Sequence, residues 1–282
     1  MSKVISIGER AIGEGKRVFV TAEVGINHNG DFKVAKKLIK AVKESGADAV
    51  KLQTYITEKR VPKDSPIYGI LKKCELSFKQ QKELFDYADS LGIIIYSTPF
   101  DDESVDFLNT INVASFKIAS FDVTNIKLVN KIAKTKRPII LSRGMTTRKE
   151  INKALEIIKR HTSSYAILHC ISAYPVKLIK DLNLKTIHSL ELLYNCPAGF
   201  SDHTIGIEAS IIAVACGAKL IEKHFTLSKA MKGPDHTLST EPKDMKLMIS
   251  EIRKVEEMLG DVVDGPIDAE KDILKYRRVT RL

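Results

Sequence analysis

The chain has 282 residues, of which 44% are apolar, 28% charged and 6% aromatic. This composition is typical of a globular protein and excludes collagen-like, coiled-coil and low-complexity architectures. The formal net charge is +10, but the basic residues are spread along the chain without interleaved aromatic residues, so we do not expect a nucleic-acid partner. Such a surplus of positive charge suits the attraction of a small anionic substrate.

The first residues and the cysteines predict the compartment. Residues 1–17 carry a charge every few positions. No apolar run approaches the roughly 18 residues that cross a bilayer, so we expect neither a signal peptide nor a membrane partner. The cysteines are far apart and form no CxxC pair, which predicts buried thiols, and neither disulfides nor a zinc knuckle, in a cytoplasmic protein. They are Cys74, Cys170, Cys196 and Cys216.

Eight short runs rich in β-branched and aromatic residues alternate with amphipathic segments along most of the chain. The predicted strands are residues 18–24, 49–55, 93–99, 115–120, 138–144, 165–172, 198–204 and 220–226. An open doubly wound sheet usually has about five or six strands, so consecutive βα units in this number favour a (β/α)8 TIM barrel of the α/β class.

The segments between the predicted strands carry helix signals. Ser77 precedes one amphipathic segment, and Thr147 or Thr146 precedes another, as N-cap residues do. Gly46 and Gly92 follow predicted last turns, where a helix commonly ends. We predict a barrel over residues 1–260 and a charged tail over residues 261–282.

In a barrel of this kind, functional groups come from the C-terminal ends of the strands and from the loops that follow. The sequence places many polar residues there, including a serine, lysine, histidine or glutamate at nearly every strand end. The candidates for catalysis and binding are Glu23, Lys51, Gln53, Thr98, Lys117, Ser120, Ser142, Tyr174, Ser201, His203, His224 and Asp235.

Two histidines occupy equivalent positions on adjacent predicted strands. His203 and His224 are 21 residues apart, one βα unit, so the barrel would bring both imidazoles to one side of its mouth. Neutral imidazoles with a carboxylate and water suit a divalent transition metal such as Mn²⁺, Fe²⁺ or Zn²⁺. The alternative is two histidines that are hydrogen-bonded separately.

Lysines within strands predict an anion site. A buried lysine is costly unless it meets an anion, and Lys51 and Lys117 both lie inside predicted strands. With serines at neighbouring strand ends they would form a pocket for phosphate and carboxylate; the alternative is that each lysine is solvated or paired with a carboxylate of the chain. Lys223 alternates with Glu222 and His224, so it points to the opposite face.

Two loops complete the predicted site. Glu23 precedes the turn GINHNG, where a glutamate can bind sugar hydroxyls or transfer a proton. Asp235 lies in GPDHTLSTEP, a setting that suits a loop facing the substrate. The chain contains neither GxGxxG nor a P-loop motif, so dinucleotide and ATP binding lack support.

Nine blocks in register resemble a known family. They are TAEVGINHNGD, AVKLQTY, YSTPFD, FKIAS, LSRGM, LHCISAYP, GFSDHTIG, EKHFT and GPDHTLSTEP, within residues 21–242. In this order they resemble the catalytic barrel of the N-acetylneuraminate (sialic acid) synthase family, including the synthases of legionaminic and related nonulosonic acids.

The resemblance implies condensation of phosphoenolpyruvate with a 2-acetamido hexose such as N-acetylmannosamine. It implies that His203 and His224 hold Mn²⁺, with Mg²⁺ or Co²⁺ as alternatives, and that Glu23 and Asp235 lie near the sugar. Phosphoenolpyruvate would be held by Lys51, Thr98, Lys117, Ser120, Ser142, Tyr174 and Ser201. The family also implies a homodimer in which a C-terminal antifreeze-like domain supplies an arginine to the partner's sugar site. We expect that domain to be absent here, with a separate protein as an alternative source of it.

Two positions depart from the family pattern: Ser172 replaces a frequent Asn, and Arg143 replaces a frequent Thr. Both would be within reach of the phosphate, and Arg143 would compensate for the missing arginine. Three alternatives stay open at this point. They are a 3-deoxy-heptulosonate or octulosonate synthase, a Schiff-base aldolase using Lys51 or Lys117, and a binding protein without turnover.

Overall fold

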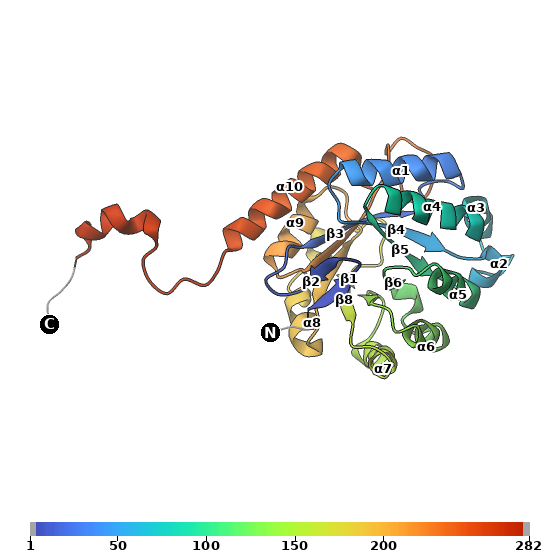
Figure 1. Cartoon of the computed structure of the whole chain (residues 1–282), viewed down its shortest axis with the longest axis horizontal. Coiled ribbons are helices and arrows are strands. Elements are labelled where there is room, and N and C mark those ends of the chain that lie inside the picture. The colour runs from blue at the N-terminus through green and yellow to red at the C-terminus, as the bar shows by residue number, and fades with distance from the viewer. Residues whose placement is uncertain (1–3, 279–282) are drawn as a thin grey trace.

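The computed structural model describes residues 4–278. A closed parallel barrel forms its centre, with the strand order β10-β3-β4-β5-β6-β7-β8-β9 (Figure 1). The predicted TIM barrel is confirmed, and each predicted strand overlaps one observed strand. The strands are β3 (Phe19–Gly25), β4 (Ala49–Thr54), β5 (Ile94–Pro99), β6 (Phe116–Ile118), β7 (Ile139–Arg143), β8 (Tyr165–Cys170), β9 (Ala198–Asp202) and β10 (Leu220–His224).

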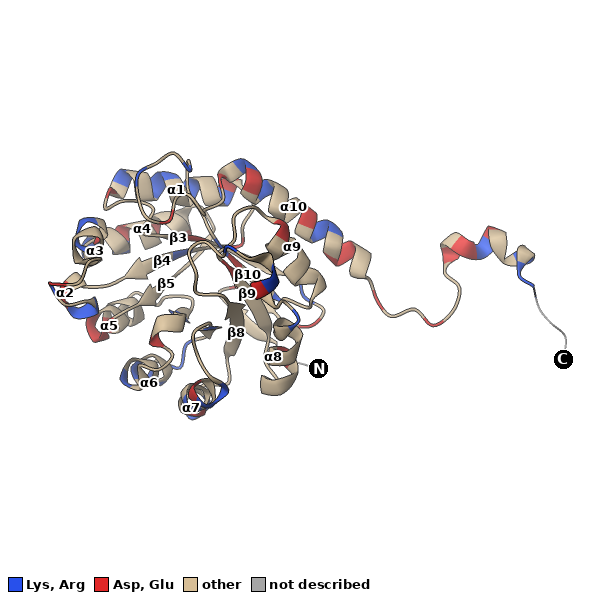
Figure 2. Cartoon of the chain, turned by 180° about the vertical axis from the view of Figure 1, so that it is seen from behind, with Lys and Arg blue, Asp and Glu red and all other residues tan. Residues whose placement is uncertain are grey.

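Helices surround the barrel, and their lysine and arginine residues are distributed over many of them (Figure 2). The major helices are α1 (Phe32–Glu44), α4 (Phe78–Ser90), α5 (Asp102–Thr110), α6 (Ile126–Lys134), α7 (Arg148–Lys159), α8 (Thr186–Tyr194), α9 (Glu208–Ala215) and α10 (Pro242–Leu259). Two short helices, α2 (Thr57–Arg60) and α3 (Tyr68–Cys74), stand between β4 and α4. They matter for the site because they extend the wall of the barrel mouth.

Local sequence explains where these helices start and how they pack. Ser77 and Thr147 both form capping boxes at the starts of α4 and α7, which stabilise a helix by roughly 1 kcal/mol each. Helix α1 buries Leu38, Ile39 and Val42 against the barrel. Burial of such side chains contributes about 1.5–3 kcal/mol each.

A hairpin that the sequence did not predict lies at the N-terminal end of the barrel. Strands β1 (Ile5–Ile7) and β2 (Arg10–Ile12) pair antiparallel, and Gly8 between them has a φ of +56°. Ile5, Ile7 and Ile12 join the main core. Strands this short carry too little alternation to be recognised, so only their packing identifies them.

The chain leaves the barrel after α10. Beyond Leu259 it runs away from the other helices to the 3₁₀ helix η3 (Asp268–Tyr276), which lies apart from the barrel (Figure 1). Within residues 4–278 all cysteines are free thiols; Cys74, Cys170 and Cys196 are buried as predicted, whereas Cys216 is only partly buried. None of the described helices has the length and apolar character needed to cross a membrane.

Candidate active site

One cavity at the C-terminal end of the barrel gathers the predicted site residues. Its volume is about 230 Å³, and all of the candidates chosen from the sequence line it. They are Glu23, Lys51, Gln53, Thr98, Lys117, Ser120, Ser142, Tyr174, Ser201, His203, His224 and Asp235. The barrel brings them together because parallel strands end at the same edge.

A network of buried lysines and glutamates forms the inner part of the cavity. Lys51 Nζ lies 3.0 Å from Glu23 Oε2 and 3.5 Å from Glu222 Oε1. Lys117 Nζ lies 3.3 Å from the same Glu222 oxygen, and Ser201 Oγ donates to it at 3.0 Å. The lysines therefore already have carboxylate partners within the chain, so an external anion is not the only source of their neutralisation.

Glu222 is held ionised at the centre of this network. Burial opposes its charge, but Lys117 and Lys51 outweigh burial and lower the pKa of Glu222 to about 2. Burial also lowers the pKa of Lys117, against the attraction of Glu222. The pKa of Lys51 is raised in spite of burial, because Glu222 and Glu23 both favour its charged form.

Glu23 differs from Glu222 in its protonation. Burial raises the pKa of Glu23 to about 7, against Lys51, which lowers it, while Glu222 raises it further. Gln53 Nε2 donates to Glu23 Oε1 at 3.2 Å, and Glu23 Oε2 accepts no hydrogen bond and faces Lys51. A carboxyl group that titrates near neutral pH is suited to general acid or base catalysis.

The raised pKa of Glu23 predicts a pH dependence of stability. Between the ordinary value of 4.5 and about 7, the folded protein binds more protons at Glu23 than the unfolded chain does. Glu23 therefore lowers the free energy of unfolding as pH rises through this window. Urea unfolding measures this effect. As pH rises across the window, the free energy of unfolding should fall less, or rise more steeply, in Glu23→Gln than in the wild type.

The control for this measurement is Glu9→Gln, which removes an exposed glutamate at the other end of the barrel. It should leave the pH dependence of the wild type unchanged. Identical curves for Glu23→Gln and the wild type would contradict the raised pKa.

The two histidines lie side by side, with ring centroids 5.5 Å apart. Nδ1 of His203 lies 2.7 Å from the carbonyl of Ile171, so it carries the proton and leaves Nε2 as an acceptor. Nδ1 of His224 is buried and has no hydrogen-bond partner among the described residues. Burial lowers the pKa of both imidazoles, so both are neutral, as metal ligation requires.

The pair fits a metal ion by its donor chemistry. Each ring keeps a nitrogen lone pair, and the unpartnered Nδ1 of His224 is unusual for a buried polar atom. Within residues 4–278 no cluster of three or more His, Cys, Asp or Glu side chains has the geometry of a metal site. Substrate and water oxygens would have to supply the other ligands.

Tyr174 and Asp235 flank the histidines. The Tyr174 ring packs on His203 with a centroid distance of 4.1 Å and meets His224 edge-on. Asp235 Oδ2 lies 3.9 Å from His224 Nδ1, and burial raises the pKa of Asp235. These side chains close the mouth beside the candidate metal ligands.

Hydroxyl groups provide hydrogen-bond donors around the lysines. Thr98 Oγ1 accepts from Lys51 at 3.3 Å, and Ser120 Oγ pairs with Ser172 Oγ at 2.9 Å. Ser142 Oγ is buried and has no hydrogen-bond partner in the part of the chain that the structure describes. An unsatisfied hydroxyl in a polar cavity is a donor available to a ligand.

Two basic residues considered from the sequence lie outside the cavity. Lys223 Nζ lies 2.9 Å from Asp202 Oδ2, with both side chains fully buried, and Ser210 of α9 donates to that oxygen. The predicted opposite orientation of Lys223 is therefore confirmed. Arg143 does not line the cavity, so the suggestion that it serves the site lacks support.

Sequence reasoning missed two charged residues of the cavity. Glu222 was placed at a strand end, but no function was predicted for it. The structure shows that it bridges Lys51 and Lys117. Arg60 lines the cavity from α2, beyond any strand end. The proximity of Glu222 to two in-strand lysines follows from barrel geometry. No sequence pattern predicts that Arg60 reaches the cavity.

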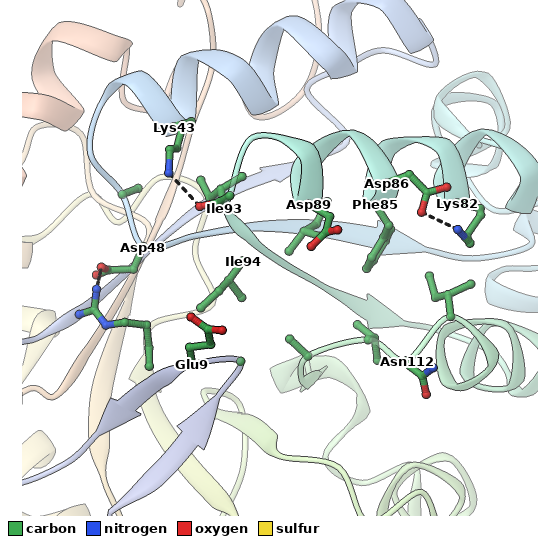
Figure 3. A pocket seen from close by; sticks show the side chains of 18 residues that line it. Glu9, Lys43, Asp48, Lys82, Phe85, Asp86, Asp89, Ile93, Ile94 and Asn112 are labelled. Atoms are coloured by element: carbon green, nitrogen blue, oxygen red, sulfur yellow. Dashed lines mark hydrogen bonds and ion pairs between the residues drawn. The ribbon is translucent and has the colours of Figure 1, made fainter.

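A larger hollow, of about 670 Å³, lies at the N-terminal end of the barrel (Figure 3). Its charged side chains largely satisfy one another: Arg10 pairs with Asp48, Lys82 with Asp86, and Lys43 donates to the carbonyl of Gly92. Because functional groups of such barrels lie at the other end, the smaller cavity is the candidate active site.

Comparison with known proteins identifies the family of the chain. Residues 38–264 match the NeuB family. An uncharacterised protein of Methanocaldococcus jannaschii is 46% identical, with 97% of this chain and 81% of that protein covered. The N,N'-diacetyllegionaminic acid synthase of Legionella pneumophila is 40% identical, covering 94% and 80% respectively.

A crystal structure of the N-acetylneuraminic acid (sialic acid) synthetase of Leptospira borgpetersenii has the same architecture. Its TM-score is 0.94 at 36% identity, and the match covers 98% of this chain and 97% of that one. The family match covers most of the chain, and the Legionella synthase is similar over nearly all of it. This chain therefore belongs to the NeuB family of sialic and other nonulosonic acid synthases.

Proposed function

We propose that this protein condenses phosphoenolpyruvate with an N-acetylated hexosamine, N-acetylmannosamine or a related 2-acetamido sugar, to form a nonulosonic acid and phosphate. The observation that carries the proposal is the buried network of Lys51, Lys117 and Glu222 beside two histidines with free ring nitrogens. Membership of the NeuB family supports the same reaction.

Lys51 and Lys117 would bind the phosphate and carboxylate of phosphoenolpyruvate. Both are partly neutralised by glutamates, so an arriving anion must compete with them. Protonation of Glu23, whose pKa is about 7, would free Lys51 from one of its two glutamates and leave it paired with Glu222. Ser142, which has a buried hydroxyl without a partner, would donate to the same anion.

His203 and His224 would hold the divalent metal, for which we propose Mn²⁺. Mg²⁺ and Co²⁺ are the alternatives, although imidazole ligands favour transition metals. A metal held by these residues would supply Lewis-acid polarisation of the aldehyde of the open-chain sugar. The backbone carbonyl of Ile171 fixes the ring of His203, and this contact keeps Nε2 directed for ligation.

The reaction forms one carbon–carbon bond and breaks one carbon–oxygen bond. C3 of phosphoenolpyruvate attacks the sugar aldehyde carbon, and water adds at C2. One proton of this water would return to Glu23, and the other would leave with the phosphate. Loss of phosphate with C–O cleavage then leaves the 2-keto acid. Protonated Glu23 would donate a proton to the former aldehyde oxygen, and Asp235, at the mouth beside His224, would accept a hydrogen bond from a sugar hydroxyl.

The test is phosphate release from phosphoenolpyruvate with Mn²⁺ and a panel of 2-acetamido aldoses. We expect release only when enzyme, metal and an accepted sugar are all present. Phosphoenolpyruvate labelled with ¹⁸O at the bridging oxygen should transfer the label to phosphate, because the C–O bond breaks. Label retained in the organic product, or trapping of a pyruvate adduct on Lys51 or Lys117 by borohydride, would contradict the proposal.

A further inference from the structure

Arg60 is a charged residue of the cavity that has no role in the proposed reaction. Its guanidinium lies over the ring of Phe100, with its carbon 3.5 Å from the ring centroid, and 4.7 Å from the centroid of Tyr55. Arg60 Nη1 donates to Gln53 Oε1 at 3.0 Å. Aromatic stacking and this hydrogen bond fix the plane of the guanidinium at the cavity wall.

Arg60 forms no ion pair with a carboxylate of residues 4–278. Among the basic side chains of the cavity, Lys51 and Lys117 form ion pairs with glutamates. Within residues 4–278, no carboxylate oxygen lies within 4.0 Å of the Arg60 guanidinium nitrogens. Since a guanidinium has several N–H donors and one is used by Gln53, the others are available to a ligand.

Arg60 lies at the outer end of the cavity. Along β4 the chain passes Lys51, then Gln53, and reaches Arg60 on α2 beyond the strand end. The phosphoenolpyruvate proposed at the lysines is therefore on the inner side. Arg60 faces the space left for the distal part of the sugar.

Apolar side chains surround this outer space. Ile67 and Ile70 are 46% and 43% exposed, Phe121 is 58% exposed, and all of them line the same cavity as Arg60. Exposed apolar residues next to a fixed cation suit a group that combines one oxygen acceptor with a methyl group.

We propose that Arg60, Ile67, Ile70 and Phe121 form a subsite for an acetamido substituent on the distal part of the acceptor sugar. The inference rests on the proposed function. The amide carbonyl accepts from Arg60, and the methyl group packs on the apolar rim. A phosphate could use the same guanidinium donors, but it would gain nothing from the exposed side chains of Ile67, Ile70 and Phe121.

The test compares three acceptors at saturating phosphoenolpyruvate and Mn²⁺: a 2,4-diacetamido-2,4,6-trideoxy hexose, N-acetylmannosamine and N-acetylmannosamine 6-phosphate. The wild type should have the highest kcat/KM for the diacetamido sugar. Arg60→Leu should reduce this preference about 10- to 100-fold, the range of a hydrogen bond to a charged donor. The loss should appear in KM for that sugar and leave KM for phosphoenolpyruvate unchanged.

Two further variants separate binding from structure. Arg60→Lys keeps the charge but loses the planar donors, so it should restore only part of the preference. Lys59→Leu alters the neighbouring residue of α2, which pairs with Glu103 outside the cavity, and should retain the wild-type preference.

Other outcomes would overturn the subsite in distinguishable ways. An equal loss for all acceptors in Arg60→Leu would indicate a purely structural role. A wild-type preference for the 6-phosphate that Arg60→Leu abolishes would identify a phosphate subsite instead. Failure of the wild type to release phosphate with any acceptor would contradict the proposed function itself and the subsite with it.

Discussion

Glu222→Gln should lower the free energy of unfolding by about 3–5 kcal/mol at neutral pH, the cost of leaving buried charges without their partner. Glu222 bridges Lys51 and Lys117, and Glu23 alone cannot replace it. We further expect phosphoenolpyruvate to restore much of this loss, because its anionic groups would meet the same lysines. Urea unfolding with and without phosphoenolpyruvate measures both effects.

Asp202→Asn is the matched control for this experiment. Asp202 forms an equally buried pair with Lys223, but that pair lies on the other face of the strands, against α9. The free energy of unfolding of Asp202→Asn should fall about as much as that of Glu222→Gln. Phosphoenolpyruvate should stabilise Asp202→Asn no more than it stabilises the wild type. Equal rescue of both variants would show that the ligand does not bind at the Glu222 lysines.

His203→Ala and His224→Ala should each weaken Mn²⁺ binding at least 100-fold and abolish turnover. Each change removes one of the two imidazoles proposed as ligands, and loss even of a hydrogen bond to a metal ligand typically costs about 10- to 100-fold in affinity. The barrel should remain folded because both rings lie at the mouth of the cavity. Calorimetric titration with Mn²⁺, together with thermal unfolding, measures these expectations.

His188→Ala provides the comparison, since His188 is exposed on α8. It should bind Mn²⁺ and turn over as the wild type does. If either His203→Ala or His224→Ala bound Mn²⁺ with the affinity of the wild type, that histidine would be excluded as a ligand, even if the variant had lost turnover.

The sequence predicted the barrel because its strands and helices obey local rules. Apolar runs of strand length and capping residues such as Ser77 and Thr147 can be recognised without any tertiary contact. The hairpin of β1 and β2 could not be predicted in this way. Its strands have three residues each, and their stability comes from isoleucines buried against distant parts of the chain.

The candidate site was predictable to the extent that it depends on strand ends. Residues as distant as Glu23 and Asp235 line one cavity because the fold fixes where strand ends meet. The partners within the cavity were not predictable. Whether Lys117 meets Glu222 or only a ligand depends on side-chain directions across the barrel, and Arg60 reaches the cavity from a one-turn helix. The roles of these residues stay predictions.

Strand β10 has a consequence for how the barrel closes. Glu222 and His224 enter the cavity, whereas Lys223 between them pairs with Asp202 on the outer face. A slip of one residue against β3 and β9 would move every side chain to the wrong side. It would place a lysine in the cavity and leave a glutamate and a histidine against the helices. Leu220 and Ile221 are the only apolar residues of this strand, so charge pairing selects its register. The last strand can therefore join its neighbours in the correct register only by placing Glu222 and His224 in the candidate active site.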